Sequence, residues 1–335
     1  MRFGPVPLDQ AAGAILAHSV PLPGGGRLRK GLVLGPAEVA ALAAAGQAAV
    51  VVALPEPGDV AEDAAAARLG AALVPDPGTA GLTLSSAFTG RVNLNAARPG
   101  LLEIDATAIH ALNRVDPAIT LATLAPFTRV TPGLLCGTVK IIAYAVDGPA
   151  LDRACAVARG AVHVRPVVRR SAGLILTGTG DEDAKLVRKG RKAVEGRLAA
   201  LGIDLAGGAL VDHEETIIPR ALSALPGEIV LILTGTATSD LHDTAPNAVR
   251  AAGGTVARFG MPVDPGNLLF HGVQGGRPVI GLPGCARSPA LNGADWVLER
   301  IACGIDLTGD DIAAMGVGGL LKEIPIRPQA REPRG

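Results

Sequence analysis

Aromatic residues and surplus charge are both scarce in this sequence. Among 335 residues there are five Phe, one Trp and one Tyr, and 31 basic residues balance 31 acidic ones. Nucleic-acid surfaces and membrane-adhering surfaces rely on excess Lys and Arg, and base stacking needs aromatic platforms. The composition therefore predicts neither a nucleic-acid partner nor a membrane partner. With 48% apolar residues, the cores must be built from Ala, Val, Leu and Ile.

Long hydrophobic runs and paired cysteines are also missing. The longest apolar stretch, residues 39–54, is rich in Ala and interrupted by Gly46 and Gln47, so it is not expected to span a bilayer. The first residues lack the charged region and apolar stretch of a secretory signal. The four cysteines form no C-x-x-C pair, which argues against a zinc site and a disulfide framework. These absences predict a soluble, cytoplasmic protein.

The pattern of predicted strands and helices divides the chain into three segments. A chain of this length is expected to form two or three domains. Residues 1–75 combine a predicted helix that begins at Pro36 with a strand at residues 49–53, which indicates a small α/β module. Residues 76–170 mix predicted strands and helices and contain no catalytic constellation, so their role is left open. Residues 171–335 alternate strands with helices.

This alternation predicts a three-layer α/β domain with a mainly parallel sheet, preceded by smaller α+β segments. The predicted strands are residues 173–177, 205–211 and 228–234, followed by a hairpin over residues 268–282. The predicted helices are residues 184–201, 214–225, 246–252 and 289–302. In such sheets, ligands bind beyond the carboxyl ends of the strands. The loops that follow the strands are therefore the predicted binding site.

One of these loops follows the third predicted strand and is rich in hydroxyl groups. Gly235 permits a tight turn, and the loop carries Thr234, Thr236 and Ser239. Hydroxyl and backbone N–H donors of this kind can hold a phosphate group. Asp243 ends the loop and has two interpretations of equal weight, a functional carboxylate or the cap of the next helix.

A second loop follows the predicted hairpin and opens the last helix. Ser288 is the predicted N-cap and Pro289 the first helical residue, so free N–H groups and the Arg287 guanidinium would attract an anion. The alternative is a plain strand-to-helix connection that happens to contain glycines. The candidate binding residues here are Gly281, Pro283, Gly284, Arg287 and Ser288.

A third loop begins at Asp212, at the end of another strand. Asp212 is expected at the same sheet edge as Asp243, where two carboxylates could hold a Mg²⁺ ion that bridges phosphates. Because Glu214 and Glu215 follow, an acidic helix start is the alternative. His213 is predicted to be a surface residue and not a ligand.

Four short motifs resemble the molybdopterin-binding domain shared by molybdopterin adenylyltransferases, molybdopterin molybdotransferases and CinA-type proteins. The family's V-x-D, T-G-G with a later Asp, K-P-G-K-P and G-L-P-G-N-P are similar to Leu210–Asp212, Thr234–Gly235 with Asp243, Met261–Asn267 and Gly281–Ala286. The family's T-G-D-E is found at Thr179–Glu182. This chain departs from the family in having Thr236 for the second glycine, Cys285 and Ala286 for N-P, and neither lysine. Residues 1–75 resemble the module that precedes the molybdotransferase binding domain.

The resemblance implies that residues 171–335 bind molybdopterin or its adenylated form. It implies a transferase of molybdenum cofactor biosynthesis that performs Mg²⁺-assisted molybdate insertion or adenylyl transfer, with molybdate and ATP as further partners. Asp212 and Asp243 would then be both metal ligands and catalytic residues. A homo-oligomer or another cofactor-biosynthesis protein is the implied macromolecular partner.

Two alternatives stay open at this point. A non-catalytic carrier would bind the cofactor and present it to another protein, which would account for the altered T-G-G and G-N-P motifs. A CinA-like nucleotide pyrophosphatase would cleave its substrate without any pterin.

Overall fold

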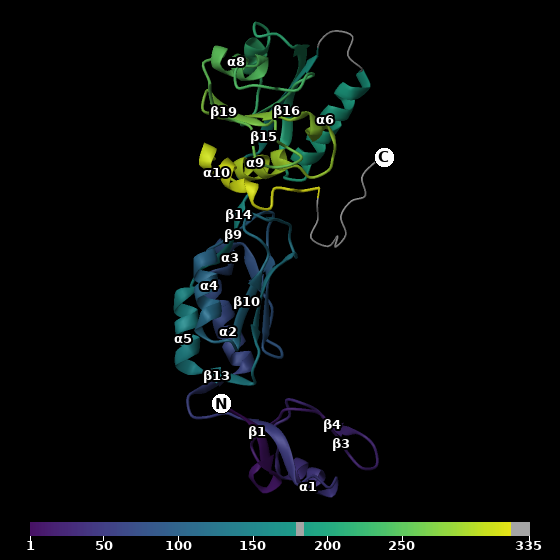
Figure 1. Cartoon of the computed structure of the whole chain (residues 1–335), viewed down its shortest axis with the longest axis vertical. Coiled ribbons are helices and arrows are strands. Elements are labelled where there is room, and N and C mark those ends of the chain that lie inside the picture. The colour runs from purple at the N-terminus through teal and green to yellow at the C-terminus, as the bar shows by residue number, and fades with distance from the viewer. Residues whose placement is uncertain (179–183, 323–335) are drawn as a thin grey trace. The chain divides into compact units, whose positions relative to one another are not determined.

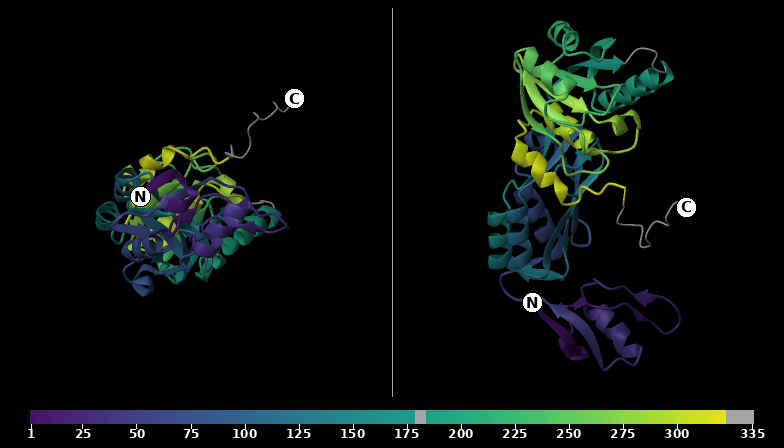
Figure 2. Two further views of the ribbon diagram at one scale, coloured as in Figure 1. Left: turned by 90° about the horizontal axis from the view of Figure 1, so that it is seen from below. Right: turned by 45° about the horizontal axis from the view of Figure 1, so that its top comes forward.

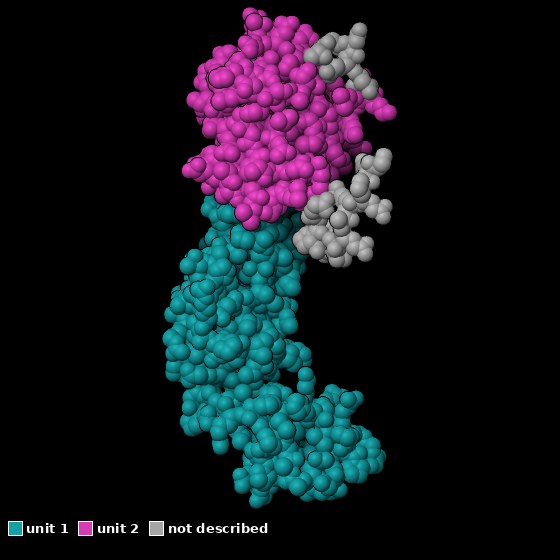
Figure 3. Space-filling view, viewed as in Figure 1, with its two compact units in different colours: residues 1–165 teal, residues 166–335 magenta. Residues whose placement is uncertain are grey.

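The structure is a computed structural model that describes residues 1–178 and 184–322. The chain divides into two compact units, residues 1–165 and residues 166–335 (Figure 3). Each unit has its own sheets and its own buried apolar clusters. Within the described ranges, none of the helices is both long enough and apolar enough to cross a membrane.

Unit 1 begins with a small antiparallel sheet and one helix. The strands are β1 (Arg2–Pro7), β2 (Ile15–Leu16), β3 (Val20–Pro21), β4 (Arg27–Leu28) and β5 (Ala49–Leu54), with a 3-10 turn η1 (Leu8–Gln10). The main sheet has the order β1-β5-β2, and β3 pairs with β4. Helix α1 (Pro36–Ala44) begins at the predicted proline, and its Leu42 packs with Leu16 and Val52.

The rest of unit 1 contains three further sheets and four helices. The strands are β6 (Asp59–Ala61), β7 (Leu82–Leu84), β8 (Arg91–Ala96), β9 (Gly100–Ile104), β10 (Ile119–Thr123), β11 (Arg129–Val130), β12 (Leu135–Ile141), β13 (Ala145–Asp147) and β14 (Val162–Pro166). The helices are α2 (Glu62–Leu73), α3 (Pro77–Ala80), α4 (Ala106–Val115) and α5 (Gly148–Val157). The strand orders are β10-β12-β8-β7, β11-β9-β14 and β13-β6.

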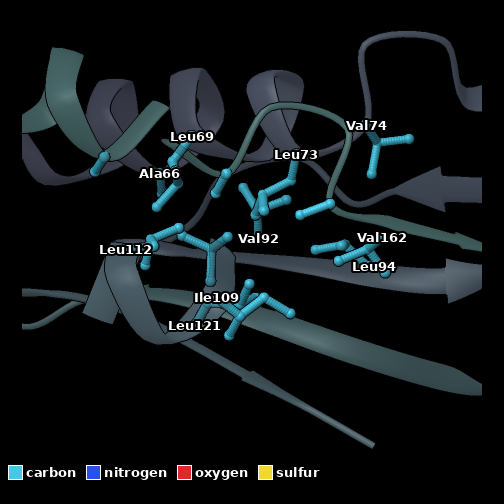
Figure 4. Packing of buried hydrophobic residues seen from close by; sticks show 14 of the residues in the cluster. Ala66, Leu69, Leu73, Val74, Val92, Leu94, Ile109, Leu112, Leu121 and Val162 are labelled. Atoms are coloured by element: carbon cyan, nitrogen blue, oxygen red, sulfur yellow. The ribbon is translucent and has the colours of Figure 1, made fainter. Parts of the chain in front are cut away.

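Helix α2 packs onto strand β8 in the largest buried cluster of unit 1. Leu69 and Leu73 of α2 face Val92 and Leu94 of β8 (Figure 4). Every second residue of β8 is buried, because successive strand residues point to opposite sides of a sheet. The labelled side chains of this core are all aliphatic, as the low aromatic content requires.

Unit 2 is built around one six-stranded sheet. Its strands are β15 (Ser171–Gly178), β16 (Asp204–Asp212), β17 (Ile229–Leu233), β18 (Thr255–Phe259), β19 (Phe270–Gln274) and β20 (Arg277–Leu282). The order is β16-β15-β17-β20-β19-β18; the first four strands are mutually parallel, and β19 is antiparallel to both of its neighbours, β20 and β18. The predicted mainly parallel sheet is confirmed.

Helices cover both faces of this sheet and give the predicted three layers (Figures 1 and 2). The helices are α6 (Ala184–Ala199), α7 (Ile218–Ala224), α8 (Thr244–Ala251), α9 (Gly293–Ala302) and α10 (Gly309–Ala313), with 3-10 turns η2 (Gly284–Arg287) and η3 (Ala314–Gly316). Ile218 of α7 and Ala248 of α8 pack on one face with Ile232 of β17. On the other face, Gly190 of α6 lies against Leu233.

Two helix starts differ from the sequence-based predictions. The last long helix begins at Gly293 with Asn292 as its N-cap, not at Pro289 with Ser288 as cap. Asn292 and Asp295 form a capping box, and this pair of reciprocal bonds is a stronger start signal than a lone serine. Helix α7 begins at Ile218, four residues after Glu214, so that Pro219 lies in its first turn, where proline costs no hydrogen bond.

Candidate functional site

The carboxyl ends of the four parallel strands define one edge of the unit 2 sheet. The last residues of β15, β16, β17 and β20 lie there, because parallel strands end on the same side. All the predicted site residues lie on these strand ends or on the loops that follow them. The segment Thr179–Glu182, which carries the T-G-D-E resemblance, lies outside the described residues.

His213 connects the ends of three strands at this edge. Its Nδ1 lies 2.8 Å from the hydroxyl of Thr177, the penultimate residue of β15, and its Nε2 lies 3.2 Å from the hydroxyl of Thr236. The Thr177 hydroxyl also accepts a hydrogen bond from the Gly235 backbone N–H at 3.0 Å. The histidine after β16 thus holds the end of β15 to the loop after β17, and it is half-buried.

Thr234 and Arg287 join the loop after β17 to the loop after β20. The Arg287 guanidinium donates to the backbone carbonyl of Thr234. The Thr234 side chain is buried, and its hydroxyl donates to the carbonyl of Thr236 at 2.5 Å. All three predicted phosphate-binding hydroxyls thus have partners, since that of Ser239 donates to the Ala237 carbonyl at 3.3 Å and that of Thr236 contacts His213. Thr236 and Ser239 are nevertheless exposed residues, whereas Thr234 is buried.

Asp243 is the N-cap of helix α8. One carboxylate oxygen accepts the Thr244 N–H at 2.7 Å, and the other accepts the Ser239 N–H at 2.8 Å. Both bonds satisfy backbone donors that a helix start and a tight loop otherwise leave unpaired. The capping interpretation of Asp243 is confirmed, and the carboxylate keeps further lone pairs that could serve a ligand.

Asp212 is the last residue of β16 and is exposed. Strand β15 lies between β16 and β17, so the two strand backbones are about 10 Å apart at the usual strand spacing. Asp212 and the loop that leads to Asp243 thus start from strands that are not neighbours. Among the described residues, no three His, Cys, Asp or Glu side chains converge in a way that could hold a metal ion.

The loop after β20 is held in shape by a buried arginine from helix α6. Arg197 donates to the backbone carbonyls of Ala286 and Ser288, both at 2.8 Å, and of Ala290 at 3.2 Å. Its Nε donates to a carboxylate oxygen of Asp295 at 2.6 Å. These bonds use three carbonyls of the segment before α9 and hold it in a non-helical turn.

The predicted residues of this loop occupy different environments. Gly281 and Pro283 are buried, and the Phe270 ring fills the space that a side chain at Gly281 would need. Gly284 is exposed, and the Ser288 hydroxyl accepts the Ala290 N–H at 3.2 Å. Gly284 is thus the predicted residue of this loop that is most open to a ligand.

The functional candidates that the sequence reasoning missed are Thr177, His213 and Arg197. Arg197 stands at a buried position of α6 beside Ala193 and Val194. A cation within an apolar helical stripe is a signal for a buried ion pair, because a charge is buried only with a partner. Thr177 and His213 gave no such signal, because each needs strand pairing to meet the other.

Comparison with known proteins gives a short family match and distant structural likenesses. A family model described as a domain of unknown function (DUF8806) matches residues 5–54. None of the curated proteins matches the chain.

Three solved structures illustrate the structural likenesses. A CinA protein of unknown function from Thermoplasma acidophilum is 12% identical with a TM-score of 0.32, over 40% of this chain and 98% of that chain. The molybdopterin biosynthesis enzyme MoaB from Thermus thermophilus is 19% identical with a TM-score of 0.27, over 40% and 97%. The molybdopterin biosynthesis MoeA protein from Pyrococcus horikoshii is 16% identical with a TM-score of 0.29, over 90% and 76%. At TM-scores this low, these likenesses carry no argument about function.

Proposed function

We propose that unit 2 binds molybdopterin or its nucleotide form at the carboxyl edge of its sheet and takes part in molybdenum cofactor biosynthesis. The observation that carries the proposal is the meeting of the strand-end loops through Thr177, His213 and Thr236 and through Arg287 and Thr234. These bonds bring hydroxyl-rich and glycine-rich loops together where doubly wound sheets bind phosphate-bearing ligands. The four motifs that resemble the molybdopterin-binding family lie on or next to these loops.

In the proposed complex, the loops contact different parts of the ligand. The exposed residues Thr236 and Ser239 and the turn at Gly235 contact the phosphate, while Gly284 offers open backbone to the pterin or its terminal phosphate. The bond from Arg287 to the Thr234 carbonyl holds the loops after β17 and β20 together, and Thr234 does not offer its hydroxyl to the ligand.

Mg²⁺ is the ion that we propose for this site. Proteins often hold Mg²⁺ through one or two carboxylates completed by waters and substrate phosphates, and Asp212 and Asp243 are the two carboxylates that we propose for this role. Bound there, the ion would neutralise charge on the reacting phosphate. The reaction we propose is molybdate insertion or adenylyl transfer, with molybdate and ATP as co-substrates.

A non-catalytic carrier is the second candidate, and the environment of Asp243 favours it. Both carboxylate oxygens accept loop and helix N–H groups, so this side chain already has a structural task. A carrier needs the same loops but no catalytic carboxylate, and it would hand the cofactor to another protein.

Binding and turnover are separated by two measurements on the full chain. Purification under anaerobic conditions, followed by oxidation, should release a fluorescent pterin; a protein that retains and binds none contradicts the proposal. Incubation with molybdopterin, ATP, Mg²⁺ and molybdate should yield adenylated or metallated product. Tight binding without product supports the carrier, and cleavage of a nucleotide pyrophosphate bond in the absence of pterin would identify a CinA-like hydrolase instead.

A further inference from the structure

Strand β16 forms one edge of the six-stranded sheet of unit 2, next to β15 (Figure 1). It is nine residues long, and its residues 205–211 contain neither a charged residue nor a proline. An edge strand leaves a row of backbone N–H and C=O groups unpaired, so proteins usually protect such an edge with charges, proline or irregular pairing. The centre of β16 carries none of these residues.

The opposite edge of the same sheet has this protection. Strand β18 is only five residues long, and its pairing with β19 is irregular between Val256 and Arg258. The Arg258 guanidinium donates to the carbonyls of Gly260 and Gly309, both at 2.8 Å, so a charged group is fixed beside this strand. The two edges therefore differ in kind, and β16 is the one suited to pairing with a further strand.

The pairing of β16 with β15 determines which of its backbone groups point outward. The His213 N–H, directly after β16, donates to the Gly178 carbonyl, and the pairing is regular from Gly207 onward. Alternate residues of a strand bond to the same neighbour. Counting back in steps of two, His213 and residues 211, 209 and 207 bond to β15. The outward residues are Gly208, Leu210 and Asp212, which we call the open edge.

The open edge offers both backbone groups and an apolar side chain. Within the described ranges, the only one of its backbone N–H and C=O groups with a hydrogen bond is the Asp212 carbonyl, which accepts the Glu214 N–H at 2.8 Å. All three residues are exposed, and Leu210, at the centre of the row, is 60% exposed. Unpaired backbone groups at this spacing are satisfied by another extended strand.

The three residues also place their side chains on one face of the sheet, because successive strand residues alternate. This is the face of helix α6, since a Cβ added at Gly208 would lie 3.4 Å from Nη1 of Arg191. That distance is ordinary contact with the end of a flexible side chain, so packing within the chain does not require glycine here. A glycine inside a strand often marks a place where another backbone approaches closely.

We propose that two copies of this chain pair through the open edge, so that antiparallel β16 strands join the two sheets. Hydrogen bonds form when outward residues oppose outward residues, and centring the pair on Leu210 places each Leu210 opposite its copy. The twofold axis is then perpendicular to the sheet, so the two exposed leucine side chains meet on the same face and shield each other from water.

Charge complementarity favours a second copy and this register. Asp212 lies opposite the partner's Gly208, and the partner's Arg191 guanidinium lies beside that glycine. Opposite residues are about 5.5 Å apart at Cα, so the exposed Asp212 carboxylate can reach this guanidinium. Twofold symmetry repeats the pair, which gives an apolar centre with charged groups at both ends. A pair centred on Gly208 would instead place Asp204 opposite Asp212, two like charges.

The inference depends on strand pairing, and it holds whichever ligand the neighbouring loops bind. A carboxylate has lone pairs for more than one partner, so an ion pair with Arg191 leaves Asp212 able to contact the proposed Mg²⁺. Pterin retention therefore reports on the proposed function, and the association state of the chain reports on this inference.

The association state of the full chain tests the proposal. Sedimentation equilibrium should show a concentration-dependent dimer for the wild type. Leu210→Pro removes an outward N–H, which an edge strand tolerates, so this variant should be folded by circular dichroism and monomeric. Leu210→Lys should raise the dissociation constant of the dimer about tenfold or more, because it places two cations at the twofold axis. Leu291→Lys is the matched control at a leucine that is 54% exposed outside β16, and it should dimerise like the wild type.

Disulfide cross-linking tests the register. A Cα separation of about 5.5 Å suits a disulfide, so Leu210→Cys should form a covalent dimer on mild oxidation. Gly208→Cys on the same face is the matched control, since it lies opposite Asp212 and should give no more covalent dimer than the wild type with its four cysteines. A wild type that stays monomeric at every concentration, a dimer that Leu210→Pro leaves intact, or equal cross-linking of the two cysteine variants would each overturn the proposal.

Discussion

Arg197 and Asp295 form a buried ion pair that joins helix α6 to helix α9 across the loop after β20. The two side chains are 9% and 12% exposed, and Nε of Arg197 lies 2.6 Å from Oδ1 of Asp295. The other carboxylate oxygen of Asp295 accepts the Asn292 N–H at 2.8 Å. Asp295 therefore has two roles: it holds Arg197, which bonds to the loop after β20, and it caps helix α9, which follows that loop.

Replacing Arg197 with Leu should strongly destabilise unit 2. The change leaves Asp295 buried without its cation and frees three backbone carbonyls, so we expect the free energy of unfolding to fall by about 3–5 kcal/mol. Urea unfolding followed by circular dichroism measures it. The control is Arg191→Ala on the same helix, which breaks an exposed pair and should cost about 0.5 kcal/mol or less. Similar losses in both variants would contradict the role assigned to the buried pair.

His213→Phe should weaken ligand binding more than it weakens the fold. Phenylalanine fills similar space but cannot bond to the hydroxyls of Thr177 and Thr236, so the end of β15 and the loop after β17 lose their connection through this residue. We expect a loss of about 1 kcal/mol of stability per bond and a clear fall in pterin retained per protein. His242→Phe, at an exposed histidine of the same edge, is the control and should retain as much pterin as the wild type. If all three proteins retain the same amount of pterin, His213 does not contribute to ligand binding.

Asp243 can be tested as a cap and as a catalytic group in one experiment. Asparagine is as good an N-cap as aspartate, so Asp243→Asn should keep wild-type stability, whereas Asp243→Ala should lose about 0.5–2 kcal/mol. If unit 2 is an enzyme, Asp243→Asn should lose turnover while it stays folded and bound to pterin. Full turnover in the asparagine variant would reduce Asp243 to its capping role.

His271 should make the protein less stable in mild acid. Burial lowers the pKa of this imidazole from its ordinary 6.5, and its Nδ1 has no hydrogen-bond partner in the described part of the chain. Below about pH 6.5 the unfolded chain gains a proton that the folded chain does not, so the stability present above this pH is lost as the pH falls. The loss is at most about 1.4 kcal/mol per pH unit. Urea titrations at two pH values measure this loss. The free energy of unfolding should fall less between them for His271→Gln than for the wild type, and an equal fall in both proteins would contradict the role of His271.

Gly281 is expected to tolerate no side chain. A Cβ there would clash with the Phe270 ring, so Gly281→Ala should cost about 1–3 kcal/mol through overpacking. Gly196→Ala is the matched control, because Gly196 lies on the exposed side of α6 and a Cβ added there would meet nothing within 4 Å. That change should stabilise the helix by up to about 1 kcal/mol. Thermal unfolding compares the two, and a higher midpoint for Gly281→Ala would show that the ring moves aside.

The architecture of unit 2 could be predicted from the sequence because it depends on local patterns. A short apolar run such as Ile229–Leu233 favours a strand buried on both faces, and the helices between such runs favour parallel pairing. Pro36 opened its helix as predicted, because proline fits the first turn wherever it occurs. The hairpin through Gly275 and Gly276 was equally local, since its turn needs residues that adopt positive φ.

The details of the site were decided by tertiary structure alone. Ser288 and Pro289 are a good local start for a helix, yet the buried guanidinium of Arg197 takes the carbonyls there, and the capping box of Asn292 starts α9 four residues later. The position of His213 between Thr177 and Thr236 depends on strand pairing. These contacts join residues 36 and 23 positions apart and depend on sheet order, which local propensity does not encode. The sequence thus determined which loops meet, and only the fold determined which atoms remain free for a ligand.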